Sequence, residues 1–300
     1  MKRLLRFPRP RCFSTFGLRN AEWNGQPISP IFDKLKPLGG GSVTVGISPL
    51  HPKLAEITIS NPSSKNALSG KMMTEFLEVV QTLKTDNEFK ETVAVCVKGE
   101  DGTGFCSGAD LSVLKDSFTK EDGVLMCHFM QYTLYGLRNL PQVSVAAIER
   151  FAVGGGTELS LSCDFRVFSH NSWFHMVQTK MGLTTGWGGG SRLTKLVGRQ
   201  KALALLPGGR RMTAEECLRN GIADKVCSEG ESLSDGTLEF LQPYLSASYS
   251  DSVRASKCVV AEADDLPMKE ALEIEAKYFK SLWGGESNTD ALSRVSTKKK

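Results

Sequence analysis

The chain has 300 residues, of which 40% are hydrophobic and 23% are charged, so it can bury one large core and is not a disordered chain. Its net charge of +4, from 37 basic and 33 acidic residues, lies partly at the two ends, so a nucleic-acid partner is not indicated. The 8 cysteines form no Cys-x-x-Cys pair and the 4 histidines lack zinc-ligand spacing, so the sequence predicts neither a disulfide framework nor a metal site. No apolar run approaches the roughly 20 residues of a membrane helix.

The first 20 residues are basic and contain no acidic side chain. With the run Arg11-Cys12-Phe13-Ser14, they have the composition of a mitochondrial presequence that ends near an Arg-x-Phe cleavage point. Pro8 and Pro10 weaken an amphipathic helix here, and the alternative is a disordered basic tail. We assign residues 1–30 to this tail or presequence.

A core unit is expected over residues 31–213, after a poorly patterned entry. Residues 21–42 lack periodicity and end in three glycines, which predicts a linker or an edge segment. Residues 43–47 and 55–60 then have the pattern of a strand pair. A helix follows, whose buried face comprises Met72, Phe76, Val80 and Leu83.

The next strand precedes a glycine-bearing turn. Residues 93–97 form a continuous apolar run, which predicts a buried strand. The turn Gly104-Phe105-Cys106-Ser107-Gly108-Ala109-Asp110-Leu111 follows it and offers a backbone N–H donor. Residues from about 113 to 138 are expected to be largely helical.

A second strand and glycine turn repeat this arrangement. Residues 143–148 have the pattern of a buried strand, Gly154-Gly155-Gly156 follows, and a helix can begin at Glu158. Backbone amides exposed at such a turn favour an anion, and two turns of this kind can form an oxyanion hole. The alternative is that the glycines only allow tight packing of strand on helix.

The alternation of strands and helices predicts an α/β fold with a sheet covered by helices. Strand patterns fade from Ala214 onward, so residues 214–300 are expected to form a helical C-terminal region. Met268, Leu272, Ala276 and Phe279 there have the spacing of a long amphipathic helix.

Taken together, the motifs resemble those of the crotonase (enoyl-CoA hydratase/isomerase) superfamily. The resemblance runs from about residue 43 to residue 226 and rests on the two glycine turns, on Met181-Gly182-Leu183 with Gly186-Trp187-Gly188-Gly189-Gly190, and on the run from Arg211 to Val226. It implies a spiral of ββα units with a helical C-terminal region. It also implies that the C-terminal helices pack on a neighbouring subunit in a homotrimer or homohexamer.

The resemblance also implies a site for an acyl-CoA thioester. The amides of Ala109 and Gly155 would form the oxyanion hole, and Glu158 would be the catalytic carboxylate. The residues implied to line the substrate are Lys65, Asn66, Ala67, Ser107, Gly108, Asp110, Leu111, Gly154, Gln178 and Trp187. No cofactor is expected, because coenzyme A is part of the substrate.

The identities of Glu158 and Gln178 limit the reactions that the predicted site can catalyse. Hydratases of the superfamily use two glutamates, and the second position here is Gln178, whose amide neither accepts nor delivers a proton at neutral pH. Hydration is therefore disfavoured. The structural alternative for Glu158 is a carboxylate that stabilises the start of a helix.

Further motifs resemble the ethylmalonyl-CoA decarboxylase branch of the superfamily. They are Glu121-Asp122-Gly123, Phe129-Met130-Gln131, Cys163-Asp164-Phe165-Arg166, Trp187, and Ser281-Leu282-Trp283-Gly284-Gly285. Two positions depart from that branch: Gln178 stands where a histidine is expected, and residues 184–185 replace a proline-bearing turn. Trp187 has two interpretations, as a packing residue or as a wall of the acyl pocket.

This branch implies decarboxylation of a 2-alkylmalonyl-CoA, ethylmalonyl-CoA or methylmalonyl-CoA, through a thioester enolate in the oxyanion hole. If apolar surroundings raise the pKa of Glu158, it can supply the final proton, whereas an ionised Glu158 would repel the substrate carboxylate. The alternatives are a one-base enoyl-CoA isomerase or hydratase of fatty-acid β-oxidation, and a CoA-binding or RNA-associated protein without turnover. The branch implies the cytosol, whereas residues 1–20 favour the mitochondrial matrix.

Overall fold

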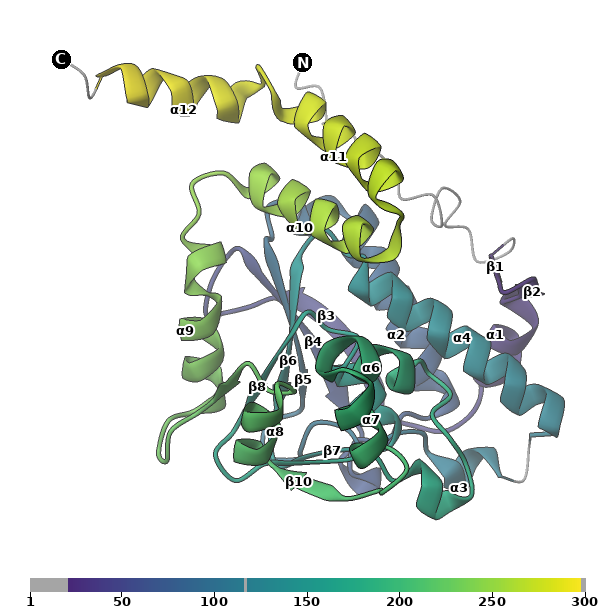
Figure 1. Cartoon of the computed structure of the whole chain (residues 1–300). Coiled ribbons are helices and arrows are strands. Elements are labelled where there is room, and N and C mark those ends of the chain that lie inside the picture. The colour runs from purple at the N-terminus through teal and green to yellow at the C-terminus, as the bar shows by residue number, and fades with distance from the viewer. Residues whose placement is uncertain (1–20, 116–117, 298–300) are drawn as a thin grey trace.

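The computed structural model, which describes residues 21–115 and 118–297, has a largely parallel sheet with helices on both faces (Figure 1). Within those residues the sheet has 6 strands, in the spatial order β11 (Lys225–Val226), β8 (Phe165–Phe168), β6 (Val143–Ile148), β5 (Ala94–Gly99), β4 (Leu54–Ser60) and β3 (Ser42–Ile47). Only β3 is antiparallel to its neighbour.

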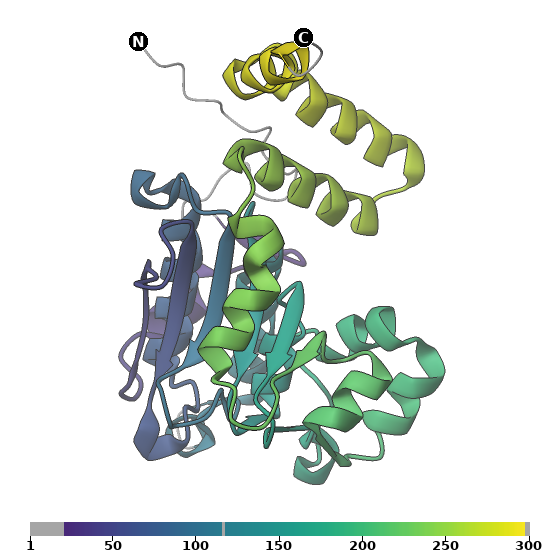
Figure 2. The same ribbon diagram turned by 90° about the vertical axis from the view of Figure 1, so that its left-hand side faces the viewer.

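Burial on both faces explains the continuous apolar runs of the central strands. All residues of β6 are buried, with Ala146 and Ile148 facing one core cluster and Val145 and Ala147 facing the other. Figure 2 shows one face covered by α9 (Leu233–Leu245). The other face is covered by α1 (Ser29–Leu35), α2 (Gly70–Thr85) and α4 (Lys120–Arg138).

A smaller sheet confirms the expected spiral of ββα units. It pairs β10 (Arg211–Thr213), β9 (Trp173–His175) and β7 (Phe151–Val153). The unit β6–β7 leads into α5 (Gly155–Ser160), and β8–β9 leads into the 3₁₀ helix η5 (Gln178–Met181). Each unit therefore gives its first strand to the large sheet and its second strand to the small one.

Short elements complete the part of the chain around these sheets. They are β1 (Glu22–Trp23), β2 (Gln26–Pro27), η3 (Pro62–Ser64), η4 (Asn87–Phe89), α3 (Leu111–Leu114), α6 (Gly189–Val197), α7 (Arg199–Leu205) and α8 (Ala214–Asn220).

Two expectations about local structure were wrong in detail. Residues 21–42 are not a linker, because β1 and β2 form a hairpin and α1 buries Ile31, Phe32 and Leu35 in the core. The helix expected from Glu158 begins three residues earlier, at Gly155, because the Gly154 carbonyl accepts the N–H groups of Thr157 and Glu158. The predicted presequence, residues 1–20, lies outside the described residues.

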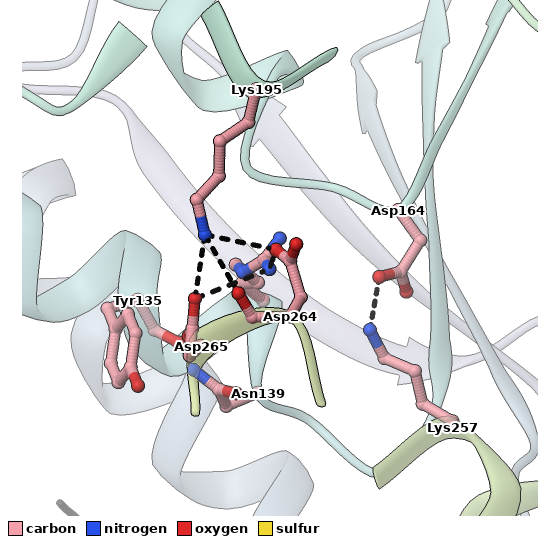
Figure 3. Close-up of polar contacts among 8 residues, drawn as sticks. Tyr135, Asn139, Asp164, Lys195, Lys257, Asp264 and Asp265 are labelled. Atoms are coloured by element: carbon pink, nitrogen blue, oxygen red, sulfur yellow. Dashed lines mark hydrogen bonds and ion pairs between the residues drawn. The ribbon is translucent and has the colours of Figure 1, made fainter. Parts of the chain in front are cut away.

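The C-terminal region is helical, as expected, apart from β11. Its last helices are α10 (Ser250–Asp265), α11 (Met268–Leu282) and α12 (Glu286–Thr297), and the last two stand apart from the sheets in both views (Figures 1 and 2). Helix α10 forms ion pairs with residues outside the C-terminal helices. Figure 3 shows Lys195 between Asp264 and Asp265, at 3.3 and 3.1 Å, and Lys257 reaching Asp164.

The described helices include none long and apolar enough to cross a membrane.

Candidate active site

The two glycine turns identified in the sequence lie against each other. The residue pair Cys106 and Ala152 forms a parallel bridge, and the Val153 N–H donates to the Cys106 carbonyl at 3.0 Å. Gly108 has φ of +102°, and a methyl group on it would lie 2.8 Å from the Gly155 nitrogen. Only glycine therefore fits at position 108, and its absence of a side chain lets the next residue, Ala109, approach Gly155.

Two amides at this junction have no protein acceptor. In the part of the chain that the structure describes, neither the Ala109 N–H nor the Gly155 N–H donates a hydrogen bond. Gly155 is the first residue of α5, where an N–H has no partner within the helix. Two unpaired donors at one place are the arrangement that stabilises an oxyanion.

Close packing explains why positions 155 and 156 are glycines. A methyl group on Gly156 would overlap the Cys106 carbonyl oxygen, and one on Gly155 would overlap the Trp187 ring. Trp187 is buried and therefore forms a wall directly beside the Gly155 amide. The packing interpretation of Trp187 is confirmed, since its ring lies in the core, and its role as a wall of the acyl pocket stays a prediction.

Glu158 lies one helical turn from Gly155 and is only 3% exposed. Its Oε2 accepts the N–H groups of Trp187 and Gly189, each at 2.8 Å. Its Oε1 accepts Gln178 Nε2 at 3.0 Å and, more weakly, the Gly186 N–H at 3.4 Å. The structure therefore places Gln178 beside Glu158.

Two opposing effects act on the Glu158 carboxyl. Burial raises its pKa above the usual range, and the four N–H donors, which stabilise the ionised form, oppose that rise. A raised pKa keeps a larger fraction of the carboxyl protonated than in water. The same donors fix where the carboxyl points.

The loop that supplies three of these donors was not assigned that role from the sequence. A methyl group on Gly189 would lie 2.5 Å from Glu158 Cγ, so glycine is required for the loop to close over the carboxylate. The Gly186 carbonyl on the outer side of the loop accepts Gln131 Nε2 at 2.8 Å. The only sequence signal was the glycine-rich run itself, which does not show what its amides bind.

The segments implied to bind coenzyme A also lie side by side. The Leu68 N–H donates to the Gly108 carbonyl at 2.7 Å, and Ser107 Oγ donates to the Ser64 carbonyl at 3.2 Å. Lys65 and Leu111 are exposed at this edge. Both side chains are therefore accessible to a ligand, and their contact with coenzyme A stays a prediction.

The same segments contain buried residues, among them Asn66, Ala67 and Asp110, and the side chains of Asn66 and Asp110 form hydrogen bonds within the fold. Asn66 Nδ2 donates to the Gly104 carbonyl at 2.7 Å, and Asn66 Oδ1 accepts the Asn61 N–H at 2.8 Å. Asp110 caps α3 by accepting from Ser112. Ala67 offers only its backbone and a methyl group. Substrate contact by Asn66, Ala67 and Asp110 remains a prediction.

A separate cavity of about 730 Å³ lies against the face of the large sheet that α9 covers. Glu56, Lys98, Arg150 and Trp173 are among its lining residues, and Ala109, Gly155 and Glu158 are not. Its charges are partly paired internally, with Lys98 Nζ 3.1 Å from Glu56 Oε2. This cavity is distinct from the candidate active site.

The chain belongs to the enoyl-CoA hydratase/isomerase family, whose model matches residues 51–299. This membership confirms the crotonase resemblance.

Individual relatives and solved structures show which members of this family the chain resembles. The chain is 38% identical over 288 residues to ethylmalonyl-CoA decarboxylase of Xenopus tropicalis, covering 95% of this chain and 92% of that protein. It is also 38% identical to ethylmalonyl-CoA decarboxylase of Danio rerio, covering 88% and 86%. Among solved structures, an enoyl-CoA hydratase from Polaromonas sp. JS666 superposes with a TM-score of 0.74 at 25% identity, covering 86% of this chain and 98% of that one.

Proposed function

We propose that this protein decarboxylates a 2-alkylmalonyl-CoA, namely ethylmalonyl-CoA or methylmalonyl-CoA. The observation that carries the proposal is the pair of unpaired amides at Ala109 and Gly155 beside a buried carboxylate, Glu158. The likeness to proteins named ethylmalonyl-CoA decarboxylase supports the choice of substrate.

In the proposed reaction the bond between the α-carbon and the substrate carboxylate breaks and releases carbon dioxide. The electron pair moves into the thioester and forms an enolate, whose negative charge develops on the thioester oxygen. Two preorganised N–H donors stabilise that charge, and removing one such donor typically costs about 10² to 10³ in rate. The donors are worth more to the enolate than to the neutral thioester, as catalysis requires.

Glu158 is proposed to complete the reaction by delivering a proton to the α-carbon and regaining one from water. Burial raises its pKa, which favours the protonated form that this step needs. Gln178, which touches Glu158 Oε1, cannot take over the transfer because an amide does not titrate near neutral pH. With one titrating group at this place instead of two, hydration of a double bond is disfavoured.

Incubation of the purified protein with ethylmalonyl-CoA, methylmalonyl-CoA, a 2-enoyl-CoA and a 3-enoyl-CoA tests the proposal. We expect the first two to lose carbon dioxide, giving butyryl-CoA and propionyl-CoA by mass spectrometry. Movement of the double bond in the enoyl substrates without any decarboxylation would instead establish the one-base isomerase. No change in any of the four would support a binding protein without turnover.

The C-terminal helices are proposed to pack on further copies of the chain in a homotrimer or homohexamer. Phe279 of α11 stacks on Trp283, which directly follows the helix, with ring centroids 5.3 Å apart, yet the two residues are 62% and 64% exposed. Helix α11 buries only Tyr278 within its own chain. A double change of Phe279 and Trp283 to Asp should lower the molar mass measured by light scattering, whereas Lys277→Asp on the same helix should not.

The mitochondrial matrix is proposed as the compartment, on the composition of residues 1–20 alone. A fusion of residues 1–30 to a fluorescent reporter tests this, and a diffuse cytosolic signal without processing near Phe13 would contradict it.

A further inference from the structure

The peptide group between Gly186 and Trp187 has hydrogen bonds at both of its ends. Its N–H, on Trp187, donates to Glu158 Oε2 at 2.8 Å. Its carbonyl oxygen, on Gly186, accepts Gln131 Nε2 at 2.8 Å and also contacts the Cys127 thiol. This single peptide group therefore connects helix α4 to the carboxylate of the candidate site.

The orientation of the Gln131 amide is fixed by its other partner. The indole N–H of Trp23 is a donor only, and it donates to Gln131 Oε1 at 3.1 Å. The Gln131 nitrogen must then face the opposite way, toward the Gly186 carbonyl, which can only accept. Trp23 in turn packs on Tyr132 and Tyr135 of α4, with ring centroids 6.1 and 5.1 Å away.

We propose that Gln131 is a positioning residue for Glu158, that it acts through the Gly186–Trp187 peptide, and that Trp23 holds Gln131 in the required orientation. The effect on turnover rests on the proposed function of Glu158 as the proton donor. The effect on the carboxylate itself follows from the contacts alone.

Hydrogen bonds in series polarise one another. An N–H becomes a stronger donor when the carbonyl of the same peptide accepts a hydrogen bond, and each bond in such a chain gains about 10–30% in condensed phase. The Gln131 contact therefore strengthens the Trp187 N–H as a donor to Glu158 and also keeps the peptide from rotating. Loss of the contact weakens the stabilisation of the ionised carboxylate, so the pKa of Glu158 should rise further.

Other groups near Glu158 do not titrate in the same range. Burial raises the pKa of the Cys127 thiol, and the Glu158 charge adds to that rise, so this thiol stays neutral. Burial lowers the pKa of Arg192 to about 10, so its guanidinium stays charged near neutral pH. Arg192 Nη1 donates to the Trp187 carbonyl at 2.7 Å and holds the next peptide of the loop. Gln178 does not ionise.

Gln131→Met tests the proposal, because methionine has nearly the same shape and carries neither the donor nor a charge. The Glu158 carboxyl is titrated by NMR of carboxyl-labelled glutamate in the unliganded full chain, and its signal is assigned by its loss in Glu158→Gln. We expect Gln131→Met to raise the pKa of Glu158 by about 0.3 to 1 pH unit. On the low-pH plateau, kcat should fall about 3- to 10-fold with KM little changed, as expected for a misplaced group.

Two further variants complete the experiment. Trp23→Phe keeps the aromatic packing and removes only the indole N–H, so it should shift the pKa in the same direction by a smaller amount. Val124→Ala, at an exposed position of the same helix, should change neither quantity. If Gln131→Met does not fold, the pKa of Glu158 in Trp23→Phe alone tests the proposal.

An unshifted Glu158 titration in the folded variants would overturn the proposal, whatever happens to the rate. A shifted titration in a protein that does not decarboxylate ethylmalonyl-CoA would leave the positioning role of Gln131 intact and would remove the proposed function.

Discussion

The site contains two sets of backbone amides that are used in opposite ways. The amides of Ala109 and Gly155 donate to no group among the described residues. The amides of Gly186, Trp187 and Gly189 all donate to Glu158. The first set is proposed to stabilise the charge that forms on the substrate, whereas the second set donates to a carboxyl group of the protein.

Glycine-rich sequence alone does not distinguish these two uses. In both places glycine permits close approach of backbone, to the neighbouring turn at Gly108 and to Glu158 at Gly189. The difference lies in the acceptor of the N–H groups, which is the Glu158 carboxylate for one set and no described group for the other. A free amide pair therefore indicates a substrate site more strongly than a glycine motif does.

The largest effect is expected from changing Glu158, the carboxylate that accepts hydrogen bonds from the second set of amides. Glu158→Gln should lower decarboxylation by about 10² to 10⁴, because the amide cannot donate the required proton. Binding of acyl-CoA should persist, since the new amide oxygen can accept the Trp187 and Gly189 amides in place of Oε2. Single-turnover rates and the Kd for butyryl-CoA separate the two effects. Decarboxylation by Glu158→Gln at the parent rate would show that Glu158 does not donate the proton and has only a structural role.

Removal of one amide from the first set should have the next largest effect. Gly155→Pro should lower turnover by about 10² to 10³, because it deletes a donor to the enolate. A side chain at this position, whether of proline or of alanine, would overlap the Trp187 ring. Gly155→Ala is therefore the matched control, which retains the N–H. Equal rates for the two folded variants would show that the amide is not used.

A charge introduced at residue 178 is expected to have the third largest effect. Gln178→Glu would place a second carboxylate about 3.0 Å from Glu158 Oε1. In the proposed reaction the substrate carboxylate lies near the same place. Like charges at that distance oppose each other, so kcat/KM for ethylmalonyl-CoA should fall roughly 10-fold or more. Gln178→Met is the uncharged control. A rate for Gln178→Glu equal to that of Gln178→Met would place the substrate carboxylate elsewhere.

The smallest effect concerns stability against pH. Burial raises the pKa of Glu158 in the folded chain, so the folded state holds this proton at pH values where the unfolded state has released it. The contribution of Glu158 is therefore fully present below its ordinary pKa and is lost as the pH rises through the raised value. Urea unfolding across this range should show a stability difference, Glu158→Gln minus parent, that grows with pH. A difference that does not change with pH would contradict the raised pKa.

The sequence predicted the elements whose pattern is local. Residues 143–148 form β6 with the expected bounds, because an unbroken apolar run has one stable place in a sheet covered on both faces. The apolar positions of α11 were likewise visible from their spacing. The elements within residues 21–42 were missed, because α1 has only 7 residues and β1 and β2 have 2 each, too few to show a periodic pattern.

The same division applies to the site. The glycine turns and Glu158 carry their own signatures in sequence. The contact between Trp23 and Gln131 joins residues 108 positions apart, and Gln131 reaches Gly186 across another 55. Such contacts depend on how helices pack on the hairpin and the loop, and no local pattern records them. Positioning residues are therefore harder to predict than the groups they position.

In the proposed reaction a thioester enolate forms beside the amides of Ala109 and Gly155 and is then protonated. Incubation of the parent protein with ethylmalonyl-CoA in D₂O, followed by mass spectrometry of the acyl-CoA, tests it most directly. We expect release of carbon dioxide and butyryl-CoA that carries one deuterium at the α-carbon. Ethylmalonyl-CoA that binds to the folded protein and is recovered unchanged would contradict it.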